Sequence, residues 1–192
     1  MEEKLVHGGD IYSPALVRAD FSANLNPLGM PERVRLAAQE AVLHSQAYPD
    51  PLCRKLRKAL SESEQLPADW ILCGNGAADL IFRLAFGLKP KKALLCAPSF
   101  ADYQAALEAA GSEIVWFDLE EREEFQVTPQ ILDAITPETE LMMLCNPNNP
   151  TGQTIEPPLM RRILNRCAET GTFLMVDECF LDFLEQQPAL TV

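Results

Sequence analysis

The sequence predicts an α/β fold in which helices cover both faces of a mostly parallel sheet. Short, nearly continuous apolar runs alternate with segments of helical periodicity in the part of the chain that follows Trp70. Such runs are typical of parallel strands that are buried on both faces. Of the 192 residues, 47% are hydrophobic and 23% are charged, as in ordinary globular domains. We therefore expect a three-layer α/β/α architecture.

The N-terminal part has a different pattern. Residues 1–30 contain many turn residues and little periodicity, and we interpret them as an N-terminal arm; residues 31–192 form the predicted domain. Pro31 can occupy the first position of a helix, and Val34 begins the apolar stripe that follows it. A second amphipathic helix is expected around residues 52–60.

The remaining elements follow in strict alternation. Thr128 and Pro129 provide a cap and a first residue for one of the helices. We expect strands at residues 93–96, 114–117, 141–145 and 173–177, and helices at residues 77–88, 100–110, 128–135 and about 158–168. The run 71–73 is a short apolar piece that precedes the first of these helices.

The composition excludes several classes of function. A formal charge of −12 argues against nucleic-acid binding, which needs clustered Lys and Arg. The six cysteines contain no Cys-x-x-Cys pair, and with only two histidines no metal cluster is visible, so free thiols in a reducing compartment fit best. The sequence shows neither a signal peptide nor a run that could span a membrane, so we expect a cytoplasmic protein.

In parallel α/β sheets, ligands bind outside the carboxyl ends of the strands. The strand 141–145 leads into Asn146-Pro-Asn-Asn-Pro-Thr-Gly152. Its prolines prevent helix or strand from continuing, so the turn holds Asn148 and Asn149 in place. Their amides could donate hydrogen bonds to a ligand, or the segment could be an ordinary surface turn.

The segment from Gly74 to Asp79 precedes a helix and could form a phosphate cup, because glycines let backbone amides approach an anion at a helix start. A plain turn before a helix is the alternative. A nicotinamide dinucleotide site is disfavoured, because Asp79 stands where a third glycine would be needed.

Two more side chains lie near predicted strand ends. Tyr103, in the first turn of a helix, could stack on a flat ring or simply fill the core. Asp177 ends an apolar strand, where a carboxylate needs a partner such as a protonated ring nitrogen, a helix start or a salt bridge. A phosphate cup, a stacking ring, an amide donor and this carboxylate together match pyridoxal phosphate.

The motifs GNGAADLIF, APSFADY, NPNNPTG and VDECFLDF, in this order, resemble the large domain of the fold-type-I aminotransferase superfamily. The HGGD, DFSANLNPLGMP and YPDP segments resemble the threonine-phosphate decarboxylases of cobalamin biosynthesis, which are close to histidinol-phosphate aminotransferases. The resemblance implies a pyridoxal-phosphate-dependent lyase, with a partial large domain at residues 31–192 and a homodimeric assembly. We therefore expect decarboxylation of L-threonine O-3-phosphate to (R)-1-amino-2-propanol O-2-phosphate.

The resemblance also implies roles for individual residues. Gly76 and Ala77 would bind the cofactor phosphate, Tyr103 would stack on the pyridine ring, Asn149 would donate to its phenolic oxygen, and Asp177 would pair with its nitrogen. Tyr48 would reach the phosphate in the partner subunit's site. The substrate would be held by His7, Gly8, Asn24 and Asn149. The catalytic residues expected in this chain are thus Asp177 and Tyr103.

Two departures from the superfamily pattern matter. Phe180 stands where aminotransferases usually carry a tyrosine, which favours the decarboxylase branch. No lysine follows Asp177, although the superfamily places its Schiff-base lysine beyond this strand. We therefore expect a truncated chain that is inactive alone. A histidinol-phosphate aminotransferase or related class I/II aminotransferase, and a truncated non-catalytic binding module, remain the alternatives.

Overall fold

The computed structural model describes residue 19 and residues 21–184. The chain divides into two compact units, Met1–Cys73 and Gly74–Val192, and each is considered by itself. Neither unit contains, among its described residues, a helix that is long and apolar enough to cross a membrane. All six cysteines are free thiols.

The described part of the first unit contains two α-helices and one 3-10 turn. Helix α1 (Glu32–Leu43) starts directly after Pro31, one position later than the sequence suggested, and none of its residues is buried. Helix α2 (Arg54–Glu64) is joined to the 3-10 turn η1 (Ala68–Trp70) by the Arg57 guanidinium, whose Nε donates to the Ala68 carbonyl at 2.8 Å. The run 71–73 that follows η1 forms no strand.

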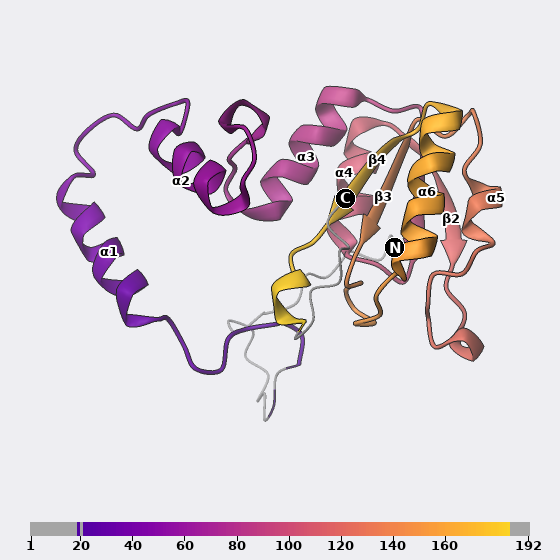
Figure 1. Cartoon of the computed structure of the whole chain (residues 1–192), viewed down its shortest axis with the longest axis horizontal. Coiled ribbons are helices and arrows are strands. Elements are labelled where there is room, and N and C mark those ends of the chain that lie inside the picture. Colours follow the sequence, from indigo (N-terminus) through magenta and orange to yellow (C-terminus); the bar gives the residue numbers. More distant parts are fainter. Residues whose placement is uncertain (1–18, 20, 185–192) are drawn as a thin grey trace, which may run out of the picture. The chain divides into compact units, whose positions relative to one another are not determined.

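The second unit contains a four-stranded parallel sheet in the order β2-β1-β3-β4 (Figure 1). The strands are β1 (Lys92–Ala97), β2 (Glu113–Asp118), β3 (Leu141–Cys145) and β4 (Phe173–Asp177). All three pairings are parallel. The predicted strands are therefore confirmed, two of them with identical bounds.

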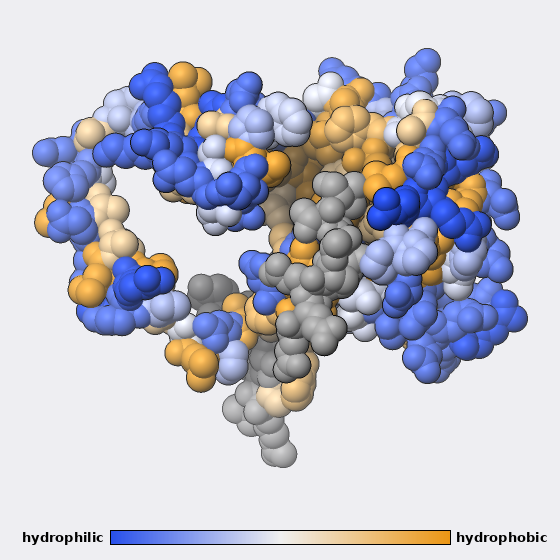
Figure 2. All heavy atoms as spheres, viewed as in Figure 1, coloured by the Kyte–Doolittle hydropathy of each residue, from blue (hydrophilic) through white to orange (hydrophobic). Residues whose placement is uncertain are grey.

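Helices cover both faces of this sheet. On one face, α3 (Gly76–Leu88) and α4 (Ala101–Ala110) pack against side chains such as Leu95 and Met143. On the other, α5 (Ile131–Ala134) and α6 (Pro157–Thr170) pack against Leu94 and Met142. Neighbouring residues of one strand thus enter opposite cores, as strand geometry requires. The outward face of α6 is hydrophilic (Figure 2). The three-layer α/β/α prediction is confirmed.

The helix predicted at residues 128–135 is the main local error. Thr128 and the two residues after it form turns with i→i+3 hydrogen bonds, including Ile131 N to Thr128 O at 3.1 Å, and α5 has only four residues. The difference lies mainly at the start, where Gln130 and not Thr128 is the N-cap residue. Ile135 is already extended and fully buried.

Candidate functional site

The carboxyl ends of three neighbouring strands are tied together by hydrogen bonds. Cys145 and Asp177 are register partners, and beyond them the Asn146 amide donates to the Asp177 carbonyl at 2.8 Å. The Asn148 side chain donates to the Pro98 carbonyl, just after β1, at 3.1 Å. Two of the sequence motifs, the Asn-Pro turn and Asp177, therefore meet at one edge of the sheet.

Within the Asn-Pro turn, the two adjacent asparagines have different environments. Asn148 is 6% exposed, and its Nδ2 also donates to the Thr151 hydroxyl at 2.9 Å. Gly152 closes the turn by donating to the Asn148 carbonyl at 2.7 Å. Asn149 is half-buried, and no described residue hydrogen-bonds its side chain. The Asn148 side chain therefore stabilises the turn through its hydrogen bonds. The side-chain amide of Asn149 has no hydrogen-bond partner among the described residues.

Asp177 is held by two donors from the protein. The Tyr103 hydroxyl donates to Oδ2 at 2.7 Å, and the Cys179 amide donates to Oδ1 at 3.0 Å. Burial, followed by the proximity of Cys145 and Asp177, raises the pKa of Tyr103 far above its ordinary value, so the hydroxyl keeps its proton. Each carboxylate oxygen has two acceptor sites, so Asp177 can still accept a further hydrogen bond.

Tyr103 is fully buried in this structure. It lies in the first turn of α4, and its ring meets Phe100 edge-on, with centroids 5.6 Å apart. Its core position agrees with the alternative weighed from the sequence, while stacking on a ligand stays a prediction. The bond between Tyr103 and Asp177 was not predicted, because nothing in the sequence relates residues 74 positions apart.

The glycine turn begins α3 on the same side of the sheet. Only three residues link the end of α3 to the start of β1, and α3 packs on the sheet, so α3 runs in the direction opposite to the strands and begins on the side toward which they end. Gly76 has φ +81°, with no atom within 4 Å of the position of a Cβ. Helix starts leave amides without helical partners, so Gly76 and Ala77 suit an anion.

Asp79 sets the charge at this helix start. Its Oδ2 accepts a hydrogen bond from the Asn75 amide at 2.9 Å, and its Oδ1 accepts one from Arg83 Nε at 2.8 Å. The Asn75 bond, followed by Arg83, lowers the pKa of Asp79. The carboxylate is thus negative and paired with Arg83. A phosphate bound to Gly76 and Ala77 would have this ion pair as its neighbour.

Four of the predicted site residues lie outside the described part of the second unit. Asn24 and Tyr48 belong to the first unit, where both are exposed, Tyr48 to 91%. His7 and Gly8 lie outside the described residues. The roles given to these four residues therefore remain predictions.

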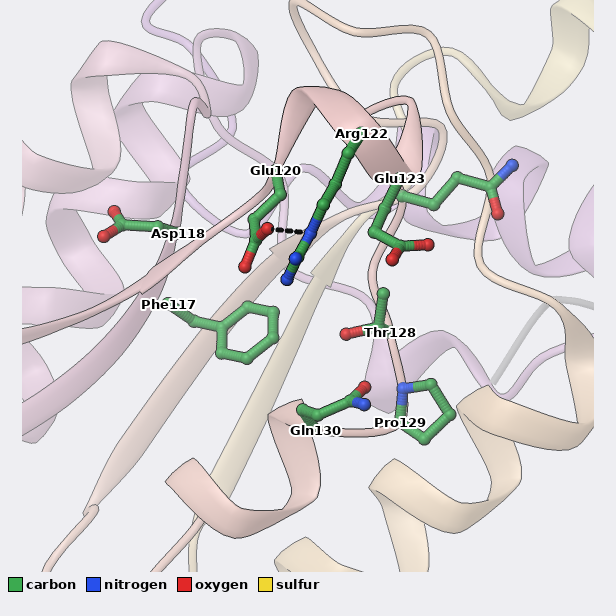
Figure 3. Close-up of a pocket in the computed structure, with 9 residues that line it drawn as sticks. Phe117, Asp118, Glu120, Arg122, Glu123, Thr128, Pro129 and Gln130 are labelled. Atoms are coloured by element: carbon green, nitrogen blue, oxygen red, sulfur yellow. Dashed lines mark ion pairs between the residues drawn. The ribbon is translucent and has the colours of Figure 1, made fainter.

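A cavity of about 310 Å³ opens at the carboxyl end of β2 (Figure 3). Three acidic residues, Asp118, Glu120 and Glu123, are among those that line it, and its single arginine, Arg122, is paired with Glu120. Such a lining repels a phosphate. None of the predicted site residues lines the cavity, so the candidate site is the edge formed by β3 and β4.

The fold and this edge define the protein as a three-layer α/β protein with polar side chains at the ends of parallel strands. Residues 19–192 match the profile of the family "Aminotransferase class I and II". The chain belongs to this family. Threonine-phosphate decarboxylases and aminotransferases of the family use pyridoxal phosphate.

Individual relatives refine the comparison. A threonine-phosphate decarboxylase from Salmonella typhimurium is 43% identical over 188 residues, which are 94% of this chain and 52% of that protein. A histidinol-phosphate aminotransferase from Symbiobacterium thermophilum is 36% identical, over 86% of this chain and 45% of that protein. The crystal structure of the histidinol-phosphate aminotransferase from Clostridium acetobutylicum superposes with a TM-score of 0.76 at 27% identity, covering 88% of this chain and 49% of that one. The chain thus spans about half the length of each of these three relatives.

Proposed function

We propose that the protein to which this chain belongs decarboxylates L-threonine O-3-phosphate to (R)-1-amino-2-propanol O-2-phosphate with pyridoxal phosphate, as a step of cobalamin biosynthesis. The observation that carries the proposal is that β3 and β4 end side by side, so that the Asn-Pro turn with Asn149 and the carboxylate of Asp177 lie at the same edge of the sheet. The identity of 43% to a threonine-phosphate decarboxylase supports this choice of reaction.

The groups at the edge fit the cofactor chemically. A pyridine ring with a phenolic oxygen and a phosphate needs a carboxylate, a neutral donor and an anion-binding turn, respectively. Asp177 supplies the carboxylate with acceptor capacity to spare, and Asn149 supplies a donor that no described residue occupies. The open Gly76 turn at the start of α3 supplies the third group.

Each residue then has a defined task. Asp177 would keep the ring nitrogen protonated, because each group favours the charged form of the other. Asn149 would donate to the phenolic oxygen, and the amides of Gly76 and Ala77 to the phosphate. The bound cofactor supplies an electron sink for the bond that breaks at the substrate Cα. Tyr103 orients the Asp177 carboxylate through its 2.7 Å hydrogen bond, and we keep its ring as the candidate stacking partner.

Substrate binding is assigned to His7, Gly8, Asn24 and Asn149. They would hold the substrate so that the bond between Cα and its carboxylate carbon, rather than the Cα–H bond, stands perpendicular to the pyridine ring of the cofactor. Tyr48 would enter the site of a second subunit, so we propose a cytoplasmic homodimer. On this proposal the 192-residue chain does not turn over the substrate by itself, because none of its lysines follows Asp177.

Histidinol-phosphate aminotransfer is the second candidate. It is favoured by the 36% identity and by the structural match with a TM-score of 0.76. Against it stands Phe180, which has no hydroxyl to donate to the phenolic oxygen. In this structure Phe180 is half-buried and packs near Phe183, with ring centroids 6.1 Å apart.

An assay of the full gene product with both substrates tests the proposal. We expect release of carbon dioxide from L-threonine O-3-phosphate without any oxo-acid acceptor. Turnover of histidinol phosphate that requires 2-oxoglutarate, with no carbon dioxide from the other substrate, would replace our assignment by the aminotransferase. A native product that ends near Val192 in lysate mass spectrometry and is inert toward both substrates would favour a non-catalytic binding module.

A further inference from the structure

Two buried polar atoms at the candidate site have no hydrogen-bond partner among the described residues. They are Nδ2 of Asn146, a donor, and Oε1 of Glu178, an acceptor. Asn146 opens the Asn-Pro turn, and Glu178 follows Asp177 directly. A buried donor or acceptor without a partner is destabilising, so unpaired groups in a native fold call for an explanation.

The orientation of the Asn146 amide is fixed by its surroundings. Its Oδ1 accepts a hydrogen bond from the Ile155 amide at 2.9 Å, and a backbone amide can only donate. A flipped side chain would set two donors against each other, so Nδ2 must be the outward donor. The residue is fully buried, and water does not reach it.

The two residues are neighbours through the backbone. The Asn146 amide donates to the carbonyl of Asp177, the residue that precedes Glu178, at 2.8 Å. This is one step beyond the last register pair of β3 and β4, which joins Cys145 to Asp177. An unpaired donor and an unpaired acceptor therefore flank the last hydrogen bond between these two strands.

We propose that Asn146 and Glu178 are positioning residues: a hydrogen bond from Asn146 Nδ2 to Glu178 Oε1 fixes the Asn-Pro turn relative to the strand end that carries Asp177. The glutamate has three side-chain dihedral angles, and a rotation about them is the movement by which Oε1 would reach the donor. The bond satisfies both atoms at once.

Burial, and then the charge of Asp177, raise the pKa of Glu178, in keeping with a carboxylate whose Oε1 has no donor. A hydrogen bond from Asn146 supplies one. The consequence for the site rests on the proposed function: Asn149 and Asp177 must be spaced to match two atoms of one ring, and the proposed bond holds the two segments at that spacing.

The first test needs no ligand. In the NMR spectrum of the chain, the Asn146 side-chain amide is assigned by its disappearance in Asn146→Ser. We expect its hydrogen-bonded proton to resonate downfield in the wild type and in Glu178→Gln, which keeps the acceptor oxygen, and to move upfield in Glu178→Ala. Glu169→Ala, which removes an exposed ion-pair partner of Arg166, is the matched control and leaves the signal in place. A signal that is insensitive to Glu178→Ala, or a glutamine variant that behaves like the alanine variant, would overturn the proposal.

The second test measures the consequence for the site. Calorimetric titration with pyridoxamine 5′-phosphate, which needs no Schiff-base lysine, is expected to show binding that is about fivefold weaker in Glu178→Ala and unchanged in Glu178→Gln. Equal affinity of all variants would refute the positioning role. A wild-type chain that binds no pyridoxamine phosphate, but whose Asn146 signal still responds to Glu178, would count against the proposed function and support the bond between Asn146 and Glu178.

Discussion

Replacing Tyr103 by phenylalanine tests the contact on which the site is built. The hydroxyl donates to the Asp177 carboxylate at 2.7 Å from a fully buried ring. Hydrogen bonds to charged groups contribute about 1.5–3 kcal/mol to stability. Phenylalanine fills nearly the same volume, and Asp177 is only half-buried and keeps the Cys179 amide as a donor. We therefore expect the lower end, a loss of about 1.5 kcal/mol in the free energy of unfolding.

Urea unfolding measures this loss. In a Trp70→Phe background, the fluorescence of Trp116 on β2 reports on the unit that contains Tyr103. Tyr48→Phe is the matched control: its side chain is 91% exposed, so its unfolding free energy should stay within about 0.5 kcal/mol of the parent. If Tyr103→Phe proves as stable as Tyr48→Phe, with the same denaturant slope, the hydrogen bond does not contribute as argued.

The difference in unfolding free energy between the parent and Tyr103→Phe is also expected to depend on pH. The pKa of Tyr103 is raised in the folded state, so the folded chain holds this proton more tightly than the unfolded chain. The resulting stability is fully present below the ordinary tyrosine pKa of about 10 and is lost as the pH rises above it. Tyr103→Phe has no hydroxyl proton to lose, so its stability does not contain this pH-dependent contribution. The difference in stability between the parent and Tyr103→Phe should therefore narrow above about pH 10.

Three further predictions follow from the structure. Asn148→Ala removes the hydrogen bond to the Pro98 carbonyl and should lower the unfolding free energy by about 1–3 kcal/mol. Asn149→Ala should leave the unfolding free energy unchanged and weaken the binding of pyridoxamine phosphate. Met143→Ala opens a cavity in the core beneath α3 and α4 and should cost about 2–5 kcal/mol in urea unfolding. Burial raises the pKa of Cys96 to about 12, so a disulfide reagent near pH 8 should modify this thiol only after denaturation.

The sheet could be predicted because its signal is local. Each strand is an apolar run whose alternate residues enter two different cores, and that pattern is present in the sequence before any contact is known. The run 141–145 therefore gave the bounds of β3 without error. The helix expected from Thr128 begins three residues later, at Ile131, because residues 128–130 form turns with i→i+3 hydrogen bonds instead of a regular helix.

The sequence also predicted that the Asn-Pro turn and Asp177 would lie at one edge of the sheet, but it could not predict the different environments of the two asparagines. Asn148 and Asn149 are chemically identical, and only the fold distinguishes them. The Pro98 carbonyl, 50 residues away, accepts a hydrogen bond from Asn148 and thereby leaves Asn149 as the free donor. The resemblance pointed to Asn149 as the ligand-binding residue, and the packing of Asn148 is consistent with that role.

The Asp177 carboxylate can accept a hydrogen bond from the protein and another from a ligand at the same time. An apolar strand that ends in a carboxylate requires compensation, and the sequence left open whether a ligand or the protein supplies it. Tyr103 supplies part of it from α4, and its hydroxyl keeps its proton because burial opposes ionisation. The carboxylate is therefore oriented before any ligand arrives, and its remaining acceptor sites can face a protonated ring nitrogen. A carboxylate that is already fixed loses less conformational entropy when it binds a cation, so the same contact that stabilises the fold favours the proposed cofactor.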